Sequence, residues 1–203
     1  LSQFSSGALY LLLLGNAFGV LLLTRERLQD TLERLETVDP LTDAPNRRGF
    51  FQLLAPWIAL ARRPGLPTAL IVFDLDGFKR VNDSYGHPAG DVVLHQMVAL
   101  CRRQLRDSDQ LGRVVGVEFA VLLPRTSLDE AVMVAERIRA AIDTTPVKSE
   151  RAMIKLTASF GVTTIRPEDS TTSLFQRADE AMQRAKQAGR NRVAPASEAV
   201  ADI

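Results

Sequence analysis

The sequence predicts an α/β (α+β) fold in which helices cover a mixed central sheet, and three observations support that prediction. Apolar runs typical of buried strands alternate along the chain with longer segments of helical periodicity. One apolar run, residues 69–73, ends in Asp-Leu-Asp-Gly at 74–77, a common way to present oxygen ligands at the edge of an open sheet. Residues 113–123 form two β-rich runs that meet at Gly116, which is typical of a hairpin.

The elements follow from local patterns in chain order. Turn-rich residues 39–48 begin the domain, and Asn46 is suited to cap the helix that follows. Residues 88–106 place apolar side chains at helical spacing. We expect helices from 46 to about 63 (disturbed at Pro56), 78–83, 88–106, 127–143 and 171–188, and strands at 68–74, 154–164 and 191–194 besides the hairpin.

Length and charge limit the classes of function. The 203 residues suit one domain of about 150 residues with an appendage. The chain has 25 basic and 24 acidic residues, so it lacks the basic excess usual in proteins that bind DNA or RNA. Cys101 is the single cysteine, which excludes a disulfide framework and favours a small core residue. We therefore predict no DNA or RNA partner.

The N-terminal segment is strongly apolar. Residues 8–23 carry no charge and approach the roughly 20 residues that a membrane helix needs, so we predict that 1–24 form a transmembrane helix ending a membrane region. A signal peptide is the main alternative, but no basic residue precedes the run; a buried soluble helix is the other. Arg25 and Arg27 follow directly, which places the rest of the chain on the cytoplasmic side of the inner membrane.

A charged segment, residues 25–38, separates this helix from the domain. Leu28, Leu32 and Leu35 are spaced four and three apart, as in a heptad. The segment is either a helical stalk that pairs with a second copy or an amphipathic helix lying on its own domain, and one heptad does not distinguish them. The domain then covers 39–194, and 195–203 form a tail.

Several motifs in residues 39–194 agree in order and spacing with one known family. They are Asp-Pro-Leu-Thr at 39–42, Asn-Arg-Arg at 46–48, Phe-Asp-Leu-Asp-Gly-Phe-Lys at 73–79, Val-Asn-Asp at 81–83, Tyr-Gly-His at 85–87 with Gly-Asp at 90–91, Ala-Ser-Phe-Gly-Val at 158–162, and Ala-Lys at 185–186 with Gly-Arg-Asn-Arg-Val at 189–193. On these motifs the segment resembles the GGDEF family, the diguanylate cyclase domains of bacterial signalling. The resemblance implies a palm-like fold similar to nucleotide cyclases and polymerases.

The resemblance also implies a reaction and its residues. Active members join two GTP molecules, each held by one subunit of a dimer, in a reaction that relies on positioning and on divalent metal ions. By resemblance, Mg²⁺ is bound by Asp74, the Leu75 carbonyl and Glu118, and Glu118 is a vestigial catalytic residue, because Val117 replaces the expected acid. The residues implied for nucleotide binding are Phe78, Lys79, Asn82, Asp91, Lys186 and Arg190, of which Asn82 and Asp91 face guanine and the three cations face phosphate.

The hairpin departs from the sequence that names the family. Where Gly-Gly-Asp/Glu-Glu-Phe is expected, residues 115–119 read Val-Gly-Val-Glu-Phe. Val117 has no oxygen to replace the metal-binding carboxylate, and Val115 is poorly suited to a tight turn against phosphate. Glu118 is then either a vestigial ligand or a polar residue beside a turn. We therefore predict little or no cyclase activity.

A second site is implied by Arg106-Asp107-Ser108-Asp109. Many family members bind cyclic di-GMP at an Arg-x-x-Asp motif that ends just before the hairpin signature, and Asp109 lies at that offset from Val115. Arg137 falls where members often place a further arginine for the same ligand. Arginine forks suit guanine edges and phosphates, and aspartate accepts from guanine. Alternatively, Arg106 is a helix C-terminal cation and Arg137 a solvated residue.

These features favour one function and leave two alternatives. We predict a membrane-tethered, degenerate GGDEF domain that binds cyclic di-GMP through Arg106, Asp109 and Arg137, and that acts through a homodimer or a signalling partner protein. Mg²⁺ and GTP are expected only if the GTP site is retained. The alternatives are an active diguanylate cyclase and an interaction module that binds no nucleotide.

Overall fold

The computed structural model describes residues 15–16, 18–25, 36–61, 66–150 and 152–197, in two units, Leu1–Glu36 and Thr37–Ile203. In the first unit, residues 18–25 are helical. Among the described residues, no helix combines the length and apolarity needed to cross a membrane. Much of the predicted transmembrane helix and stalk, including residues 1–14 and 26–35, lies outside the described residues, so both stay predictions.

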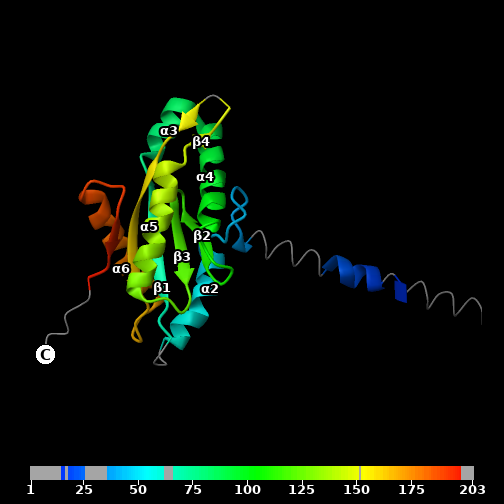
Figure 1. The fold of residues 1–203 in the computed structure, drawn as a ribbon. Coiled ribbons are helices and arrows are strands. Elements are labelled where there is room, and N and C mark those ends of the chain that lie inside the picture. The colour runs from blue at the N-terminus through cyan, green and yellow to red at the C-terminus, as the bar shows by residue number, and fades with distance from the viewer. Residues whose placement is uncertain (1–14, 17, 26–35, 62–65, 151, 198–203) are drawn as a thin grey trace, which may run out of the picture. The chain divides into compact units, whose positions relative to one another are not determined.

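The second unit contains helices and strands in the mixed order that the sequence predicts (Figure 1). The helices are α2 (Arg47–Leu60), α3 (Phe78–Tyr85), α4 (His87–Arg102), α5 (Leu128–Thr144) and α6 (Thr171–Gln187). The strands are β1 (Ala69–Asp76), β2 (Gln110–Val115), β3 (Glu118–Leu123), β4 (Val147–Lys148), β5 (Met153–Ile154), β6 (Thr157–Thr164) and β7 (Val193–Pro195). The small β4–β5 hairpin was not predicted, because strands of two residues have no measurable periodicity.

Five strands form one mixed sheet in the order β2-β3-β1-β6-β7. All neighbours are antiparallel except β6 and β7, which are parallel. Strand β1 is central, so its last residues have neighbours on both sides. Asp74 lies opposite Glu118 of β3 and opposite Ser159 of β6. This register brings the hairpin signature directly beside the Asp-Leu-Asp sequence.

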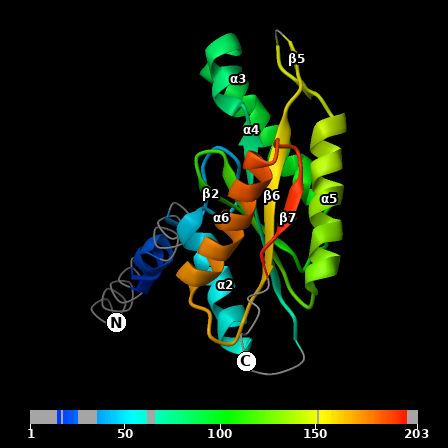
Figure 2. The ribbon, with the colours of Figure 1, turned by 90° about the vertical axis from the view of Figure 1, so that its left-hand side faces the viewer.

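Helices cover both faces of the sheet (Figures 1 and 2). Because side chains alternate along a strand, Ile71 and Phe73 of β1 contribute to a core cluster with α4 and α5, while Leu70 and Val72 contribute to a second cluster with α2 and α6. The predicted sheet covered by helices is therefore confirmed.

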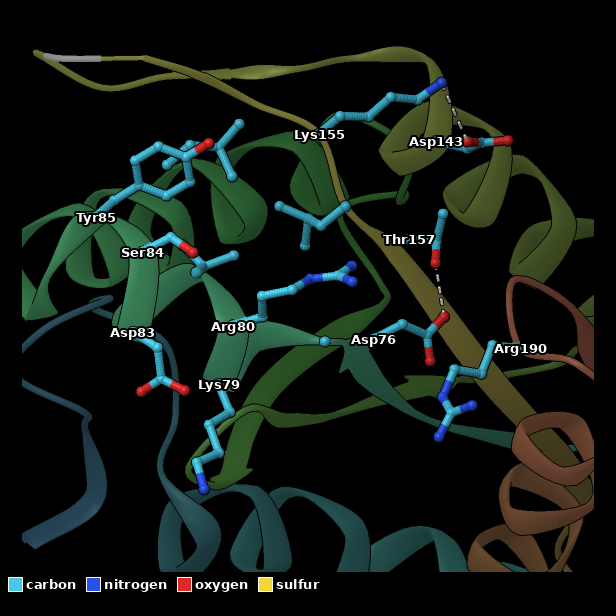
Figure 3. Close-up of a pocket in the computed structure, with 14 residues that line it drawn as sticks. Asp76, Lys79, Arg80, Asp83, Ser84, Tyr85, Asp143, Lys155, Thr157 and Arg190 are labelled. Carbon is cyan, nitrogen blue, oxygen red and sulfur yellow. Dashed lines mark hydrogen bonds and ion pairs between the residues drawn. The ribbon is translucent and has the colours of Figure 1, made fainter.

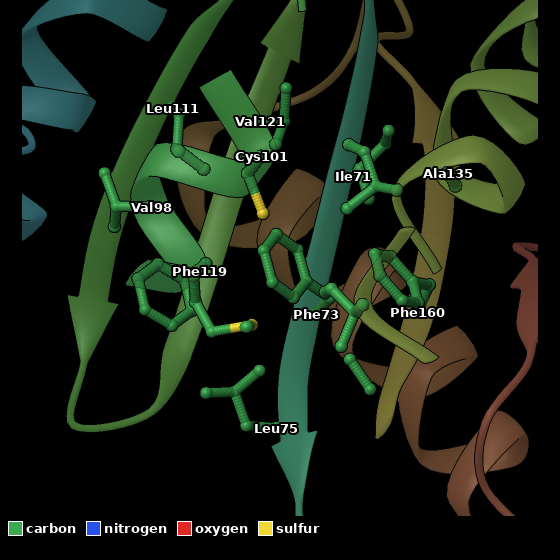
Figure 4. Close-up of a cluster of buried hydrophobic side chains, with 14 of the residues drawn as sticks. Ile71, Phe73, Leu75, Val98, Cys101, Leu111, Phe119, Val121, Ala135 and Phe160 are labelled. Atoms are coloured by element: carbon green, nitrogen blue, oxygen red, sulfur yellow. The ribbon is translucent and has the colours of Figure 1, made fainter. Parts of the chain in front are cut away.

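Aromatic rings fix the centre of the first cluster. Phe73 stacks on Phe119 at 5.3 Å and on Phe160 at 4.8 Å between ring centroids, so three adjacent strands are joined by one stack (Figure 4). Cys101 lies in the same cluster, and burial raises the pKa of its thiol to about 12. The cysteine is thus an inert core residue, as predicted.

The first helix of the domain begins as predicted and ends earlier. The Asn46 side chain accepts a hydrogen bond from the Gly49 amide at 3.0 Å, which caps α2. Pro56 lies inside the helix without ending it, and α2 stops at Leu60. The predicted end near residue 63 was therefore too late.

Candidate functional site

The two aspartates at the end of β1 lie on the same face of the strand and have different surroundings. Asp74 forms an ion pair with Lys186 of α6 through Oδ2, and its side chain is 20% exposed. Its Oδ1 is buried and accepts no hydrogen bond within the part of the chain that the structure describes. A buried carboxylate oxygen without a donor is costly, so Asp74 is suited to a cationic ligand.

Asp76, in contrast, has its acceptor oxygens in use. Oδ2 accepts from the Thr157 hydroxyl at 2.8 Å and from the Asn191 backbone N–H at 3.1 Å, and Oδ1 accepts from the Ser159 hydroxyl at 2.8 Å. These bonds tie the end of β1 to β6 and to the segment after α6. The two aspartates therefore do not act as a pair, although their spacing in the sequence suggests one.

Glu118 begins β3 directly opposite Asp74. Burial raises the pKa of the Glu118 carboxyl, and the negative charges of Asp179 and Asp74 raise it further, while Lys186 and Arg47 act in the opposite direction. The net effect is a pKa above the ordinary value of 4.5. Two carboxylates thus face each other at a point where negative charge is disfavoured, as at many cation sites.

The turn between β2 and β3 closes without strain at Val115. Gly116 takes the left-handed conformation, with φ of 54°, whereas Val115 is not among the described residues with positive φ. Val115 ends β2 with its side chain 55% exposed. The expected backbone cost of valine at this position is therefore absent, and what remains is its bulk on the surface of the turn. Val117 packs against the first core cluster.

The donors present fit a Mg²⁺ site only in part. Asp74 has a free buried oxygen and Glu118 a raised pKa, both of which a cation relieves. Position 117, however, contributes a partly buried hydrocarbon side chain that packs against the first core cluster. Among the described residues, no three His, Cys, Asp or Glu side chains gather closely enough to hold a metal ion. The residues therefore make an incomplete Mg²⁺ site.

The residues implied for guanine lie where α3 meets α4. Oδ1 of Asn82 is buried and has no hydrogen-bond partner in the described segments. It lies against Gly90 so closely that a Cβ there would be 2.0 Å from it, and the Phe78 ring would be 3.0 Å away. Asp91 is the next residue and is exposed. Acceptors at this junction suit the N–H groups of a guanine edge.

The three implied phosphate cations are not equally available. Lys186 is engaged by Asp74, and Lys79 is exposed on α3. Arg190 lines a cavity of about 1060 Å³ between α3 and the start of β6. In Figure 3 the guanidinium groups of Arg80 and Arg190 extend on either side of Asp76. The cavity is therefore lined by two arginines and by the Asp76 carboxylate, whose oxygens already accept hydrogen bonds from the protein.

The Arg-x-x-Asp residues form a compact turn after α4. The Asp109 carboxylate accepts from the Arg106 backbone N–H at 2.8 Å, which fixes the turn and leaves both side chains near the surface. Arg137 of α5 donates to the Gln104 carbonyl in the same turn. The structure thus places the Arg106 backbone and the side chains of Asp109 and Arg137 at the same turn.

Two residues of the site were missed in the sequence. Asp179 contributes negative charge at Glu118, and Asn191 donates its N–H to Asp76. Asp179 was detectable, because it precedes Lys186 by two helical turns and shares its face of α6. Asn191 lies in an irregular turn, where no periodicity indicates which way the backbone faces.

Comparisons with known proteins agree with this geometry. A family model described as "Diguanylate cyclase, GGDEF domain" matches residues 36–192. Diguanylate cyclase DgcP of Pseudomonas aeruginosa is 41% identical over 166 residues, which cover 82% of this chain and 25% of that protein. Diguanylate cyclase DgcM of Escherichia coli is 36% identical over 169 residues, covering 83% of this chain and 40% of that protein. The chain thus spans well under half the length of these relatives.

Solved structures show the same fold. The coiled coil and GGDEF domain of DgcB from Caulobacter crescentus, in complex with c-di-GMP, superposes with a TM-score of 0.82 at 31% identity, covering 90% of this chain and 97% of that one. Diguanylate cyclase SiaD from Pseudomonas aeruginosa, in complex with its activator SiaC, gives 0.77 at 33% identity, covering 96% and 75%. The chain belongs to the GGDEF domain family.

Proposed function

We propose that this chain is a guanine-nucleotide-binding GGDEF domain with little or no cyclase activity, which acts as a receptor for cyclic di-GMP. The main support for the proposal is the hydrocarbon side chain of Val117. This partly buried side chain packs against the first core cluster at the position where the family places a metal-binding carboxylate. Because the reaction depends on neutralising phosphate charge with metal ions, loss of a ligand lowers turnover more than it lowers nucleotide binding.

The GTP half-site keeps its other parts. Asn82 and Asp91 stand at the α3–α4 junction for guanine, with Phe78 against Gly90. Lys79, Lys186 and Arg190 supply positive charge for phosphates, and Asp74, the Leu75 carbonyl and Glu118 are the remaining oxygens for Mg²⁺. This set supports binding of GTP with weak metal affinity.

The receptor site is the turn that joins Arg106, Asp109 and Arg137. DgcB, a relative of the same fold, is described in complex with c-di-GMP. In this chain the Asp109 bond to the Arg106 backbone preorganises the turn, and the Arg137 bond to Gln104 brings the second arginine to it. Preorganised side chains lose less entropy when they bind a ligand.

The second candidate is an active diguanylate cyclase. The comparisons favour it, because the relatives at 41% and 36% identity carry that name. The hairpin favours the first candidate. A third possibility is an interaction module that binds no nucleotide.

One pair of measurements separates the candidates. Cyclic di-GMP is titrated calorimetrically into the full chain and into Arg106→Ala, and cyclic di-GMP formation from GTP and Mg²⁺ is followed in parallel. Micromolar binding that weakens at least tenfold in the variant, without turnover, supports the receptor. Turnover that disappears in Asp74→Ala supports the cyclase. If the chain shows neither cyclic di-GMP binding nor turnover of GTP, the interaction module is the remaining candidate.

We also propose that the domain is tethered to a membrane and pairs with another protein chain. Residues 1–24 anchor the chain in the inner membrane with residues 39–194 in the cytoplasm, and the 25–38 segment joins two copies or contacts a signalling partner. SiaD, which shares the fold, is described in complex with an activator protein. Membrane fractionation of the full chain and crosslinking through residues 25–38 test these two points.

A further inference from the structure

We infer that Asp76 is a positioning residue that holds Arg190 toward the phosphate groups of a bound guanine nucleotide. The inference rests on the proposed function, since it assumes that the domain binds such a nucleotide. It gives Asp76 a role that differs from the role of Asp74, although the two side chains share one face of β1.

The Asp76 carboxylate is committed to the protein itself. It accepts two hydroxyl hydrogen bonds from β6, from Thr157 and Ser159, and one from the backbone N–H of Asn191. Ser159 is fully buried, whereas Asp76 and Thr157 also line the cavity between α3 and β6. The bond to Asn191 is the one that reaches beyond the sheet, because it fixes the residue that follows Arg190.

The segment held in this way has an unusual backbone. Gly189, Arg190 and Asn191 all have positive φ, of 116°, 63° and 45°. Glycine and asparagine tolerate this region, but arginine with its Cβ does not favour it. Such a conformation persists only where neighbouring groups hold it, and it is characteristic of functional sites.

A second set of bonds holds the same turn from the other side. The Asn191 side chain accepts from Nη1 of Arg139 at 2.8 Å and donates to Oδ2 of Asp143 at 3.3 Å. Both partners belong to α5. The turn is therefore fixed between the end of β1 and the end of α5, and the orientation of Arg190 is set by both.

The Arg190 side chain itself takes no part in this network. Its guanidinium group has no hydrogen bond or ion pair to any residue that the structure describes, and Arg190 is an exposed residue in the lining of the cavity between α3 and β6. The strain at Arg190 is thus not compensated by a contact of its own side chain. An arginine whose backbone is fixed by its neighbour, and whose guanidinium group has no partner among the described residues, is suited to bind a phosphate.

The test separates the phosphate-dependent part of affinity from the rest. GTP and guanosine are each titrated into the full chain with Mg²⁺ present, and the ratio of their dissociation constants is compared among variants. We expect Asp76→Ala and Arg190→Ala each to reduce the GTP preference about tenfold, since a charge-assisted hydrogen bond is worth about that factor. We expect the double variant to lose no more than either single one.

Conservative variants distinguish positioning from metal binding and from folding. Asp76→Asn keeps an oxygen for the Asn191 N–H and the Thr157 hydroxyl, and it offers an NH₂ group to the oxygen of the Ser159 hydroxyl, so it is expected to retain the GTP preference. Thr157→Val removes one bond to Asp76 and leaves the Asn191 bond, so it lowers the melting temperature with the preference unchanged. Should Asp76→Ala fail to fold, Asp76→Ser replaces it, because its hydroxyl is too short to reach the Asn191 N–H.

Each outcome has one meaning. An unchanged GTP preference in Asp76→Ala or Asp76→Ser, or losses that multiply in the double variant, overturns the inference while the proposed function stands. Loss of the preference in Asp76→Asn also overturns it, because the carboxylate charge is then needed, as in a metal ligand. If the parent chain binds neither GTP nor guanosine, the GTP-binding part of the proposed function fails and the inference fails with it, whereas the receptor for cyclic di-GMP is tested separately by its own titration.

Discussion

Asp39 and Arg113 form an ion pair across 74 positions of sequence, with Nη1 of Arg113 at 3.1 Å and 2.9 Å from the two carboxylate oxygens. Nε of the same arginine donates to the Gly116 carbonyl at 2.7 Å, and Asp39 also accepts from Thr42. One guanidinium group therefore joins the first turn of the domain to the turn of the β2–β3 hairpin. A change at residue 39 is transmitted directly to the signature.

Asp39→Ala is expected to destabilise the domain by about 1.5–3 kcal/mol, because hydrogen bonds to a charged partner are lost and Arg113 stays half-buried. Urea unfolding at pH 7 measures the loss. Arg102→Ala is the control, since it removes only an exposed hydrogen bond to the Asp43 carbonyl and should cost at most about 0.5 kcal/mol. Equal losses in the two variants would argue against the ion pair.

The same pair predicts a dependence on pH. Partial burial raises the pKa of Asp39, but hydrogen bonds from Thr42 and Arg113 and the charge of Arg113 lower it more, to below its ordinary 3.8. A lowered folded-state pKa gives stability that is present above pH 3.8 and lost as the pH falls through the folded value. The difference between parent and Asp39→Asn should therefore shrink in acid, and a constant difference in melting temperature from pH 7 to pH 3 would refute this.

For Glu118 we predict a pH dependence of stability opposite to that of Asp39. Its pKa is raised by burial and by the charges of Asp179 and Asp74, so the charged form costs stability above pH 4.5. Glu118→Gln should raise the melting temperature at pH 7, and the gain should disappear as the pH falls toward 4. The exposed Glu168→Gln serves as the control and should show no such gain. A lower melting temperature for Glu118→Gln at neutral pH would show that Lys186 and Arg47 dominate instead.

Restoring the missing carboxylate should raise cyclase activity. Val117→Glu together with Val115→Gly recreates the family signature, and we expect cyclic di-GMP formation from GTP to rise at least tenfold, as an added metal ligand stabilises the phosphate charge. Product is measured by chromatography with Mg²⁺ in excess. Met133→Glu, at a side chain 64% exposed on α5, controls for added charge. Parent activity equal to that of the double variant would favour the cyclase candidate.

Two neighbouring substitutions at the α3–α4 junction should have different effects on folding. Gly90→Ala places a methyl group 2.0 Å from Oδ1 of Asn82, and overpacking of this kind costs about 1–3 kcal/mol. It should therefore weaken both folding and GTP binding. Asp91→Ala, one residue later and exposed, should weaken GTP binding and leave unfolding by urea unchanged. Full GTP affinity in Gly90→Ala would show that guanine does not depend on this junction.

Much of the fold was predictable because it depends on local periodicity and on buried apolar runs. Strand β1 and helices α5 and α6 begin and end within about two residues of their predicted bounds. The β4–β5 hairpin was not predictable, since strands of two residues are too short for a pattern, and α2 ends at Leu60, before the predicted bound near residue 63.

The site was predictable in its residues and less so in their roles. Asp74 and Asp76 look equivalent in the sequence, but only the fold shows that Thr157, Ser159 and Asn191 occupy the second carboxylate. Val115 was expected to disturb the turn, and the positive φ of Gly116 shows that one glycine suffices. Motif positions locate a site, whereas partners from distant segments decide what each side chain does there.

The three stacked phenylalanines at the centre of the sheet and the arginine that holds the hairpin turn stabilise the domain in different ways. The stack joins β1, β3 and β6 through side chains buried in the core, whereas the tip of the hairpin is secured by Arg113 bonding to a backbone carbonyl. A backbone carbonyl is present whatever the side chain. Substitutions that keep the backbone conformation of the tip therefore leave this bond, and with it the shape of the hairpin, in place.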